Sequence, residues 1–360
     1  MSKLKISQAL ADYKKLSYIK EDDTNPPVVE LDCALGSNPF GCSEAVKKAM
    51  LEAEDLSPYP NYPYTQTLEA LSTFWSRIGQ VKPANFRICG GSIAALESIC
   101  RIFTANSAVA LGFSPQFTDF KACVMGNGGL YETVELPRGA NCKFNENTLL
   151  DVLGDRHSLV YIDNPNNPTG QVINLEQIEK ILKKAEDKSI AVLVDEAYGD
   201  FIEDSESAIA LLGKYENLLV VRSFSKGYGL AGLRVGYSVC SEELQNYLRK
   251  VGMPFTVTSR NAKAAIVALV DQDFIKYTRT EVAKIKGKIL SGLTKLECLE
   301  TDPRTPIMAL KDRSGDDLFK KLLKKGVLTE SGQDIGLDKQ FVRLRVNQQC
   351  DRLIEILNSI

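Results

Sequence analysis

A lysine beside a glycine-rich stretch is the first feature of the sequence that could do chemistry. Residues 223–237 read SFSKGYGLAGLRVGY, so Lys226 directly precedes a G-x-G-x-x-G pattern and Arg234 follows it. That pattern is typical of a dinucleotide-binding turn, which should open a helix and be followed by an acid closing a second strand. Residues 233–239 instead predict another strand, and no such acid follows. The stretch therefore favours a loop that presents an amine.

Polar residues also gather where three apolar runs end. Asn167 follows the run 158–163. Asp195 ends the run 190–195, and Tyr198 comes three residues later. Ser223 lies at the end of the run 218–224, and Ser225 and Lys226 follow it. Ligands bind at the carboxyl ends of strands in open α/β sheets. A carboxylate, a phenol, an amide, hydroxyls, a lysine and an arginine gathered there match the functional groups of one cofactor, pyridoxal phosphate.

The elements that must position these residues predict an α/β fold. The three runs and a fourth at 107–112 are typical of buried parallel strands. Between two of them, Asn174 is expected to cap a helix whose apolar stripe is Leu175, Ile178, Leu182 and Ala185. We expect a three-layer α/β/α domain with a mainly parallel sheet at 45–240. A smaller α+β domain would comprise 241–360 with part of an N-terminal arm at 1–44, whose first 16 residues read as an amphipathic helix.

Composition restricts the partners and the compartment. The 360 residues carry 46 acids and 44 bases, a net charge of −2, which gives no reason to bind nucleic acid or an anionic membrane. No signal peptide or membrane span is recognisable. The nine cysteines form no C-x-x-C pair, and His157 is the only histidine. We expect a reduced, cytoplasmic protein without a metal site or a histidine-based triad.

Three motifs carry a resemblance to a known family. NNPTG, DEAY and SFSKGYGLAGLRVGY occur in the order and spacing of fold-type I, class I/II pyridoxal-phosphate aminotransferases. The segments LDCALGSNPFG, YPNYPYTQTLEAL and GGSIAALESICRIF are similar to the branch that contains histidinol-phosphate aminotransferase and threonine-phosphate decarboxylase. The resemblance implies an enzyme that moves an amino group between an amino acid or amine phosphate and a 2-oxo acid.

The resemblance also implies roles at the cofactor ring. Lys226 would hold the cofactor as a Schiff base and move the proton. Asp195 would pair with the pyridine nitrogen, and Tyr198 and Asn167 would bond the ring oxygen. Phe117, two residues after Pro115, would stack on the ring.

Other residues would hold the phosphate and the substrate. The phosphate would be bound by Ser223, Ser225 and Arg234, by the Ser92 hydroxyl, by the backbone amides of Gly91 to Ile93, and by Tyr59 from the partner of a homodimer. Arg343, in the run FVRLRV, would grip the substrate carboxylate, and Asn38 and Asn167 would lie beside it. We expect Arg345 on the opposite face of that strand.

Departures from the family pattern leave the reaction open. Ile93 and Ala94 replace acidic residues, Thr256 replaces an asparagine, Arg260 adds a charge, and NQQC replaces a glycine-bearing turn. A decarboxylase, lyase or cyclase with the same cofactor is therefore an alternative. A binding module without catalysis is a third, although no basic patch or DNA-binding extension supports it.

Overall fold

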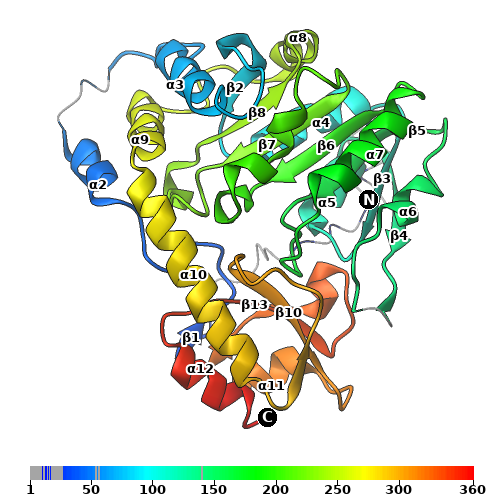
Figure 1. Ribbon diagram of the computed structural model, residues 1–360, viewed down its shortest axis with the longest axis vertical. Coiled ribbons are helices and arrows are strands. Elements are labelled where there is room, and N and C mark those ends of the chain that lie inside the picture. Colours follow the sequence, from blue (N-terminus) through cyan, green and yellow to red (C-terminus); the bar gives the residue numbers. More distant parts are fainter. Residues whose placement is uncertain are drawn as a thin grey trace, which may run out of the picture.

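The chain folds into a large and a small layered unit. The computed structural model describes residues 10, 13, 15, 17, 27–52, 55, 57–138 and 141–360. The helix expected at residues 1–16 therefore lies, apart from positions 10, 13 and 15, outside the described residues. Figure 1 shows the large unit above, the small unit below, and helix α10 (Gln272–Gly292) running from one to the other.

A seven-stranded sheet forms the centre of the large unit. Its order is β2-β8-β7-β6-β5-β3-β4. The strands are β2 (Phe86–Cys89), β3 (Val109–Ser114), β4 (Leu130–Glu135), β5 (His157–Asp163), β6 (Ala191–Glu196), β7 (Leu218–Ser223) and β8 (Gly236–Cys240). Strands β7, β6, β5, β3 and β4 are parallel, whereas β8 is antiparallel to both of its neighbours. The mainly parallel sheet of the expected α/β class is confirmed.

Helices cover both faces of this sheet because the strands are apolar on both sides. Along β5, Leu159 and Tyr161 belong to one core cluster, and Val160 and Ile162 belong to the other. This alternation is the consequence of the two-residue period of a strand. The helices of the Leu159 side are α4 (Ser92–Phe103), α5 (Thr118–Gly126) and α8 (Glu242–Val251). Those of the other side include α2 (Glu44–Leu51), α3 (Thr65–Trp75), α6 (Glu146–Leu150), α7 (Leu175–Glu186) and α9 (Ser259–Val270).

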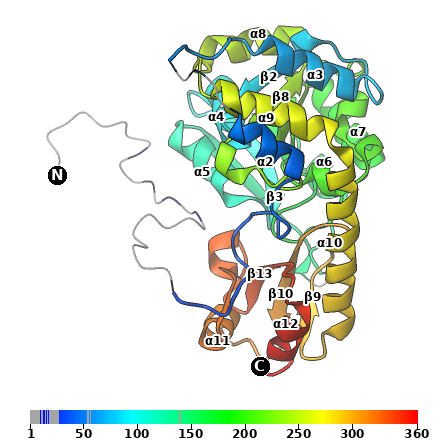
Figure 2. The same ribbon diagram turned by 90° about the vertical axis from the view of Figure 1, so that its left-hand side faces the viewer.

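The small unit is built on an antiparallel sheet of order β12-β13-β10-β9. Its strands are β9 (Leu296–Cys298), β10 (Ile307–Asp312), β12 (Glu330–Ser331) and β13 (Phe341–Arg345). Helices α11 (Leu318–Lys324) and α12 (Cys350–Leu357) share its core with part of α10. Strand β1 (Leu31–Asp32) pairs in parallel with β11 (Val327–Leu328), so the chain after residue 30 is anchored to the C-terminal unit (Figure 2).

The chain changes from one core to the other within α10. Ile275 lies in a core cluster of the large unit, whereas Val282 and Ile289 lie in the core of the small unit. Helices α8 and α9 follow residue 240 in sequence but still pack against α4, α2 and α3. The packing thus changes later than the expected division at residue 240.

The expected elements agree closely with the observed ones. Strands β3, β5, β6 and β7 lie within two residues of the runs at 107–112, 158–163, 190–195 and 218–224. Asn174 caps α7 with a reciprocal bond to Gln177, as its sequence position predicts. The strand expected at 233–239 begins only at Gly236, because Ala231–Leu233 is a turn of 3-10 helix and Arg234 has a φ of 52°.

Candidate active site

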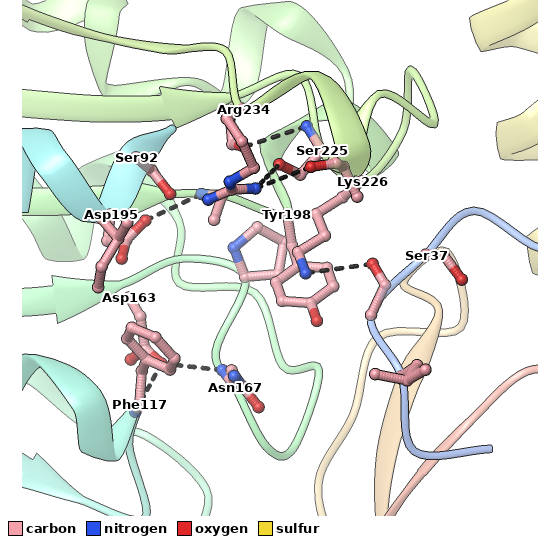
Figure 3. A pocket seen from close by; sticks show the side chains of 17 residues that line it. Ser37, Ser92, Phe117, Asp163, Asn167, Asp195, Tyr198, Ser225, Lys226 and Arg234 are labelled. Atoms are coloured by element: carbon pink, nitrogen blue, oxygen red, sulfur yellow. Dashed lines mark hydrogen bonds between the residues drawn. The ribbon is translucent and has the colours of Figure 1, made fainter. Parts of the chain in front are cut away.

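One cavity lies at the carboxyl ends of β5, β6 and β7. It has a volume of about 470 Å³ and is closed on one side by residues 35–37. Figure 3 shows its side chains converging from the large sheet and from that segment. The lining comprises Leu35, Gly36, Ser37, Ser92, Ile93, Phe117, Asp163, Pro165, Asn167, Asp195, Ala197, Tyr198, Ser223, Ser225, Lys226, Ala231 and Arg234. Ten of the predicted site residues are in this set.

The N-terminus of α4 and the loop after β7 make the anion-binding end of the cavity. Gly91 precedes the helix with a φ of 81°, and Ser92 is its first residue. Arg234 Nη1 donates to Ser225 Oγ at 3.4 Å, and Ser223 Oγ accepts from the Ser225 amide at 3.0 Å. The positive φ at position 91 favours glycine, and a Cβ atom there would lie 2.6 Å from Arg234 Nη2, which would have to move. The helix N-terminus and the guanidinium together favour a phosphate.

Two buried carboxyl groups lie side by side beneath the cavity. Asp163 and Asp195 are register partners at the ends of β5 and β6. Asp195 accepts from the Tyr161 hydroxyl at 3.0 Å and from the Ala197 amide at 3.0 Å. Burial raises the pKa of Asp195 to about 6 and that of Asp163 to about 7. The Lys226 cation offsets part of this effect at Asp195, and a cationic ring nitrogen placed here would lower the pKa of Asp195 further.

Asp163 also positions two residues of the cavity wall. Its Oδ2 atom accepts hydrogen bonds from the backbone amides of Phe117 at 3.2 Å and Asn167 at 2.9 Å. Its Oδ1 atom accepts from the Asn166 side chain at 3.0 Å. The carboxylate of Asp163 therefore fixes the backbone positions of Phe117 and Asn167, whose side chains border the cavity.

Lys226 brings an amine into the middle of the cavity. Its Nζ donates to the Gly36 carbonyl at 3.1 Å and lies 5.4 Å from the centre of the Tyr198 ring (Figure 3). Burial lowers the pKa of this amine from its usual value, and the nearby Arg345, Arg343 and Arg234 cations add to that effect. A larger share of the amine is thus neutral and able to accept a proton.

Tyr198 is surrounded by cations. Its hydroxyl accepts from Arg345 Nη1 at 2.8 Å. Burial alone would raise its pKa, but Lys226, Arg345 and Arg343 outweigh that effect and lower the pKa to about 8. The phenol can therefore give up its proton more readily than an ordinary tyrosine.

The expectation that Arg345 faces away from Arg343 was wrong. Residues two apart in a strand point to the same face, and both arginines of β13 reach the cavity wall. Arg343 donates to Asn167 Oδ1 at 3.0 Å and to the Ala34 carbonyl at 2.9 Å, and it lies 3.4 Å from a carboxylate oxygen of Glu330. The two guanidinium groups therefore act from one side of the small sheet.

Four predicted site residues lie outside the lining. Arg343 is 2% exposed and touches the cavity through Asn167. Asn38 donates to the Gly227 carbonyl at 2.7 Å, next to Lys226. Tyr59 is 81% exposed and borders a separate surface hollow of about 460 Å³, where its ring lies 5.0 Å from that of Phe255. Gly91 lies directly behind Ser92 and contacts the cavity only through Arg234.

Asp163, Tyr161 and Arg345 are the residues that sequence reasoning missed. Asp163 occupies the same place after its strand as Asp195 does after the next, which was the available signal. The alternation of a strand should have placed Arg345 beside Arg343. Nothing in the sequence indicates that the Tyr161 hydroxyl bonds Asp195.

The described ranges contain neither a membrane span nor a metal cluster. No helix within them is long and apolar enough to cross a bilayer. No group of three or more His, Cys, Asp or Glu side chains in this part of the chain is placed to hold a metal ion.

Comparison with known proteins gives a consistent result. Residues 30–357 match the family Aminotransferase class I and II. Histidinol-phosphate aminotransferase 2 of Archaeoglobus fulgidus is 31% identical over 348 residues, which are 94% of this chain and 95% of the relative.

Solved structures share the fold at lower identity. The histidinol-phosphate aminotransferase of Clostridium acetobutylicum superposes with a TM-score of 0.82 at 21% identity, covering 91% of this chain and 98% of that one. The enzyme of the same name from Sinorhizobium meliloti, in complex with pyridoxal-5′-phosphate, superposes with a TM-score of 0.77 at 22% identity, covering 92% and 89%. The chain therefore belongs to the aminotransferase class I and II family and is a pyridoxal-phosphate-dependent aminotransferase, whose substrate classes are amino acids and 2-oxo acids.

Proposed function

We propose that the cavity transfers an amino group between an amino acid or amine phosphate and a 2-oxo acid, with Lys226 as the proton-transfer residue. The observation that carries this proposal is the position of Lys226 Nζ. It is a buried amine of lowered pKa in the same cavity as a phosphate-binding helix end and a buried carboxylate. Pyridoxal phosphate supplies a reactive carbonyl and an electron-accepting ring at such a site.

The phosphate would be held at the α4 end of the cavity. Ser92, Ser223, Ser225 and Arg234 offer hydroxyl and guanidinium donors there, and the amides of the first turn of α4 add to them. The ring would lie between Phe117 and the carboxylate edge of the sheet. The close approach of Arg234 to Gly91, at the start of α4, supports this arrangement because it brings a cation to the helix N-terminus.

The remaining residues would set the charge and the position of the reacting atoms. Asp195 would keep a proton on the ring nitrogen through its negative charge. Tyr198 and Asn167 would hydrogen-bond the ring oxygen. Lys226 Nζ would accept the proton from the substrate carbon that bears the amino group, because its lowered pKa leaves it partly neutral.

Arg343 would bind the acidic group of the substrate. Its guanidinium is buried beside Asn167 and has the planar donor geometry that suits a carboxylate. Asn38 would support this region by fixing the loop at Gly227. Since the relative from Archaeoglobus fulgidus carries the name histidinol-phosphate aminotransferase, histidinol phosphate is the first amine to test.

We also propose a homodimer in which each protomer completes the site of the other. Tyr59, Tyr62 and Phe255 form an aromatic cluster on the surface, with exposures of 81%, 40% and 45%. Such a cluster is typical of an interface. Tyr59 would reach the phosphate of the partner subunit. The nine cysteines are all free thiols, which supports a reducing, cytoplasmic location.

The experiment is a spectrum of the purified enzyme loaded with pyridoxal phosphate while amines are added one at a time. Transfer predicts that a donor removes the visible absorbance of the cofactor and that a 2-oxo acid restores it. The donor that responds identifies the substrate. Release of carbon dioxide, or of an eliminated group, without a 2-oxo product would contradict amino transfer and support a decarboxylase, lyase or cyclase.

A further inference from the structure

The two arginines of β13 make parallel sets of contacts. Arg343 donates to the Ala34 carbonyl and to Asn167 Oδ1, and Arg345 donates to the Ser37 carbonyl at 3.1 Å and to the Tyr198 hydroxyl at 2.8 Å. Each side chain thus joins the wall segment 34–38 to one polar group of the cavity. Both arginines are 2% exposed. Neither the comparisons nor the family resemblance gives Arg345 a role.

The wall segment 34–38 is held by cations along its length. Arg343 bonds its first carbonyl, Lys226 bonds the Gly36 carbonyl and Arg345 bonds the Ser37 carbonyl. Two of these donors have other tasks in the proposed function, because Lys226 would engage the cofactor and Arg343 the substrate. Arg345 is the cation that can keep its bond to the wall throughout the reaction.

Arg345 also determines the environment of the Tyr198 hydroxyl. Its guanidinium carbon lies 5.6 Å from the centre of the Tyr198 ring, in addition to the hydrogen bond to the hydroxyl. Because a guanidinium can only donate, the phenol oxygen accepts from it, and the phenol proton is directed to another acceptor. The ring oxygen of the cofactor is the acceptor that the proposed function places there.

We propose that Arg345 is a positioning residue of the transfer reaction, which holds the Tyr198 hydroxyl and the Ser37 carbonyl in the geometry that the cofactor requires. This proposal rests on the proposed function of the cavity. The charged groups that face Tyr198 are Lys226 from the loop after β7 and Arg343 and Arg345 from β13. Removal of one of these three cations raises the pH at which the phenol ionises.

The test compares Arg345→Met and Arg345→Lys with Arg343→Lys, each loaded with pyridoxal phosphate. The visible absorbance of the bound cofactor is titrated with pH, and kcat and KM are measured with the best amine donor. We expect Arg345→Met to lower kcat roughly ten- to a hundredfold, as for loss of a charged hydrogen bond. The alkaline transition in its titration should move upward toward the ordinary tyrosine value of about 10.

Two comparisons separate positioning from a purely structural role. The alkaline transition of Arg345→Lys should stay close to that of the wild type, because lysine keeps the positive charge beside Tyr198. Arg343→Lys should chiefly raise the KM of the donor. In a Tyr198→Phe background, Arg345→Met should produce no further shift of the transition. The proposal is overturned if Arg345→Met lowers only the unfolding temperature and leaves the titration unchanged, or if its shift persists in the Tyr198→Phe background.

The design remains decisive if a variant or the proposed reaction fails. Should Arg345→Met not fold, Arg345→Gln also removes the positive charge and gives the same comparison in the wild-type and Tyr198→Phe backgrounds. Should the wild-type enzyme transfer no amino group to any 2-oxo acid, the proposed function falls. The absorbance titration of the bound cofactor still tests the link between Arg345 and Tyr198.

Discussion

The carboxyl edge of the seven-stranded sheet and strand β13 of the small sheet bring charge to one cavity in different ways. Asp163, Asp195 and Ser223 each stand at the end of a parallel strand, so their place follows from where the strand stops. Arg343 and Arg345 project from one face of an antiparallel strand. In the proposed function the edge would supply groups for the cofactor, whereas the cations of β13 bond the carbonyls of the wall segment.

The difference extends to the pKa values. Burial raises the pKa of both aspartates at the sheet edge, although the Lys226 cation partly offsets this at Asp195. Around Tyr198 positive charge is in excess, and the phenol pKa falls to about 8. A cofactor with a cationic ring nitrogen and an acidic ring oxygen would satisfy both ends at once.

Replacement of Lys226 by alanine gives the largest effect that we expect on the edge side. The rate of amino transfer should fall roughly 10⁴-fold, because the proton-transfer residue is lost. The visible absorbance of the bound cofactor should change as well. Unfolding should remain cooperative, because removing a buried amine relieves its desolvation. Single-turnover absorbance and a thermal melt measure both results.

Lys276→Ala is the matched control, since that lysine lies on α10 with 73% of its side chain exposed. It should leave rate, spectrum and melt unchanged. Persistence of normal cofactor absorbance and turnover in Lys226→Ala would show that the central assignment is wrong.

Asp195→Asn should rank second and should separate the two carboxyl groups of the edge. A charge pair at ~4 Å with an effective dielectric of ~20 is worth ~4 kcal/mol, or about 10³-fold in rate. Asp163→Asn should cost about tenfold or less, because an amide oxygen can still accept from the Phe117 and Asn167 amides. Equal losses of rate in the two variants would contradict the proposal that Asp195 acts through its charge and Asp163 through its hydrogen bonds to the backbone.

The same pair predicts a pH dependence of cofactor binding. In the proposed function the cofactor binds the ionised form of Asp195, whose pKa is raised to about 6. The Kd for pyridoxal phosphate should therefore rise as the pH falls below about 6, by up to tenfold per unit. Equilibrium dialysis across this range measures it. The Kd of Asp163→Asn should keep this dependence on pH, whereas the Kd of Asp195→Asn should depend on pH more weakly.

Whether the sequence predicts a residue of this site depends on whether a local motif fixes the position of that residue. Lys226, Asp195 and Tyr198 lie at fixed distances from strand ends, so motif and spacing place them. Asp163 was overlooked because an aspartate after a strand also suits an ordinary turn. The contacts of Arg345 join residues 308 or more positions apart in β13 and the wall segment, and no local pattern encodes them.

The contacts of a buried lysine in the small unit could not be predicted from the sequence either. Lys286 of α10 is fully buried, and its Nζ donates to Thr305 Oγ1 at 2.9 Å and to the Asp302 and Ile307 carbonyls at 2.6 and 2.7 Å. Thr305 in turn donates to the carbonyl of Gly170, in the turn that carries Asn167. Thr301 Oγ1 is a fourth acceptor, and two of the four acceptors of Lys286 are backbone carbonyls, whose positions cannot be read from the sequence.

Lys286→Met is the smallest of the expected effects and concerns stability. Burial lowers the pKa of Lys286 to about 7 from its usual 10.5. The unfolded chain therefore binds more protons between these values, so the stability that this group contributes is full above pH 10.5 and is lost as the pH falls toward 7. The unfolding free energy of the wild type minus that of the variant should rise by up to ~1.4 kcal/mol per pH unit across this window.

Urea unfolding at several pH values measures that difference. Lys284→Met on the same helix, where 73% of the lysine side chain is exposed, should show a flat difference. A flat difference for Lys286→Met as well would mean that the buried amine keeps its charge throughout. Lys286 would then keep its positive charge although it is buried, in contrast to the buried aspartates of the sheet edge, whose pKa values are raised.

The wall segment 34–38 has a consequence for the order in which the protein matures during synthesis. Arg343 and Arg345, which bond the Ala34 and Ser37 carbonyls of the wall, are synthesised 309 and 308 residues after them. Domains generally fold N-terminal first during translation. A nascent chain that has already formed the seven-stranded sheet would therefore present an open cavity until β13 pairs with β10. Closure of the cavity thus depends on contacts between two segments that lie more than 300 residues apart in the chain.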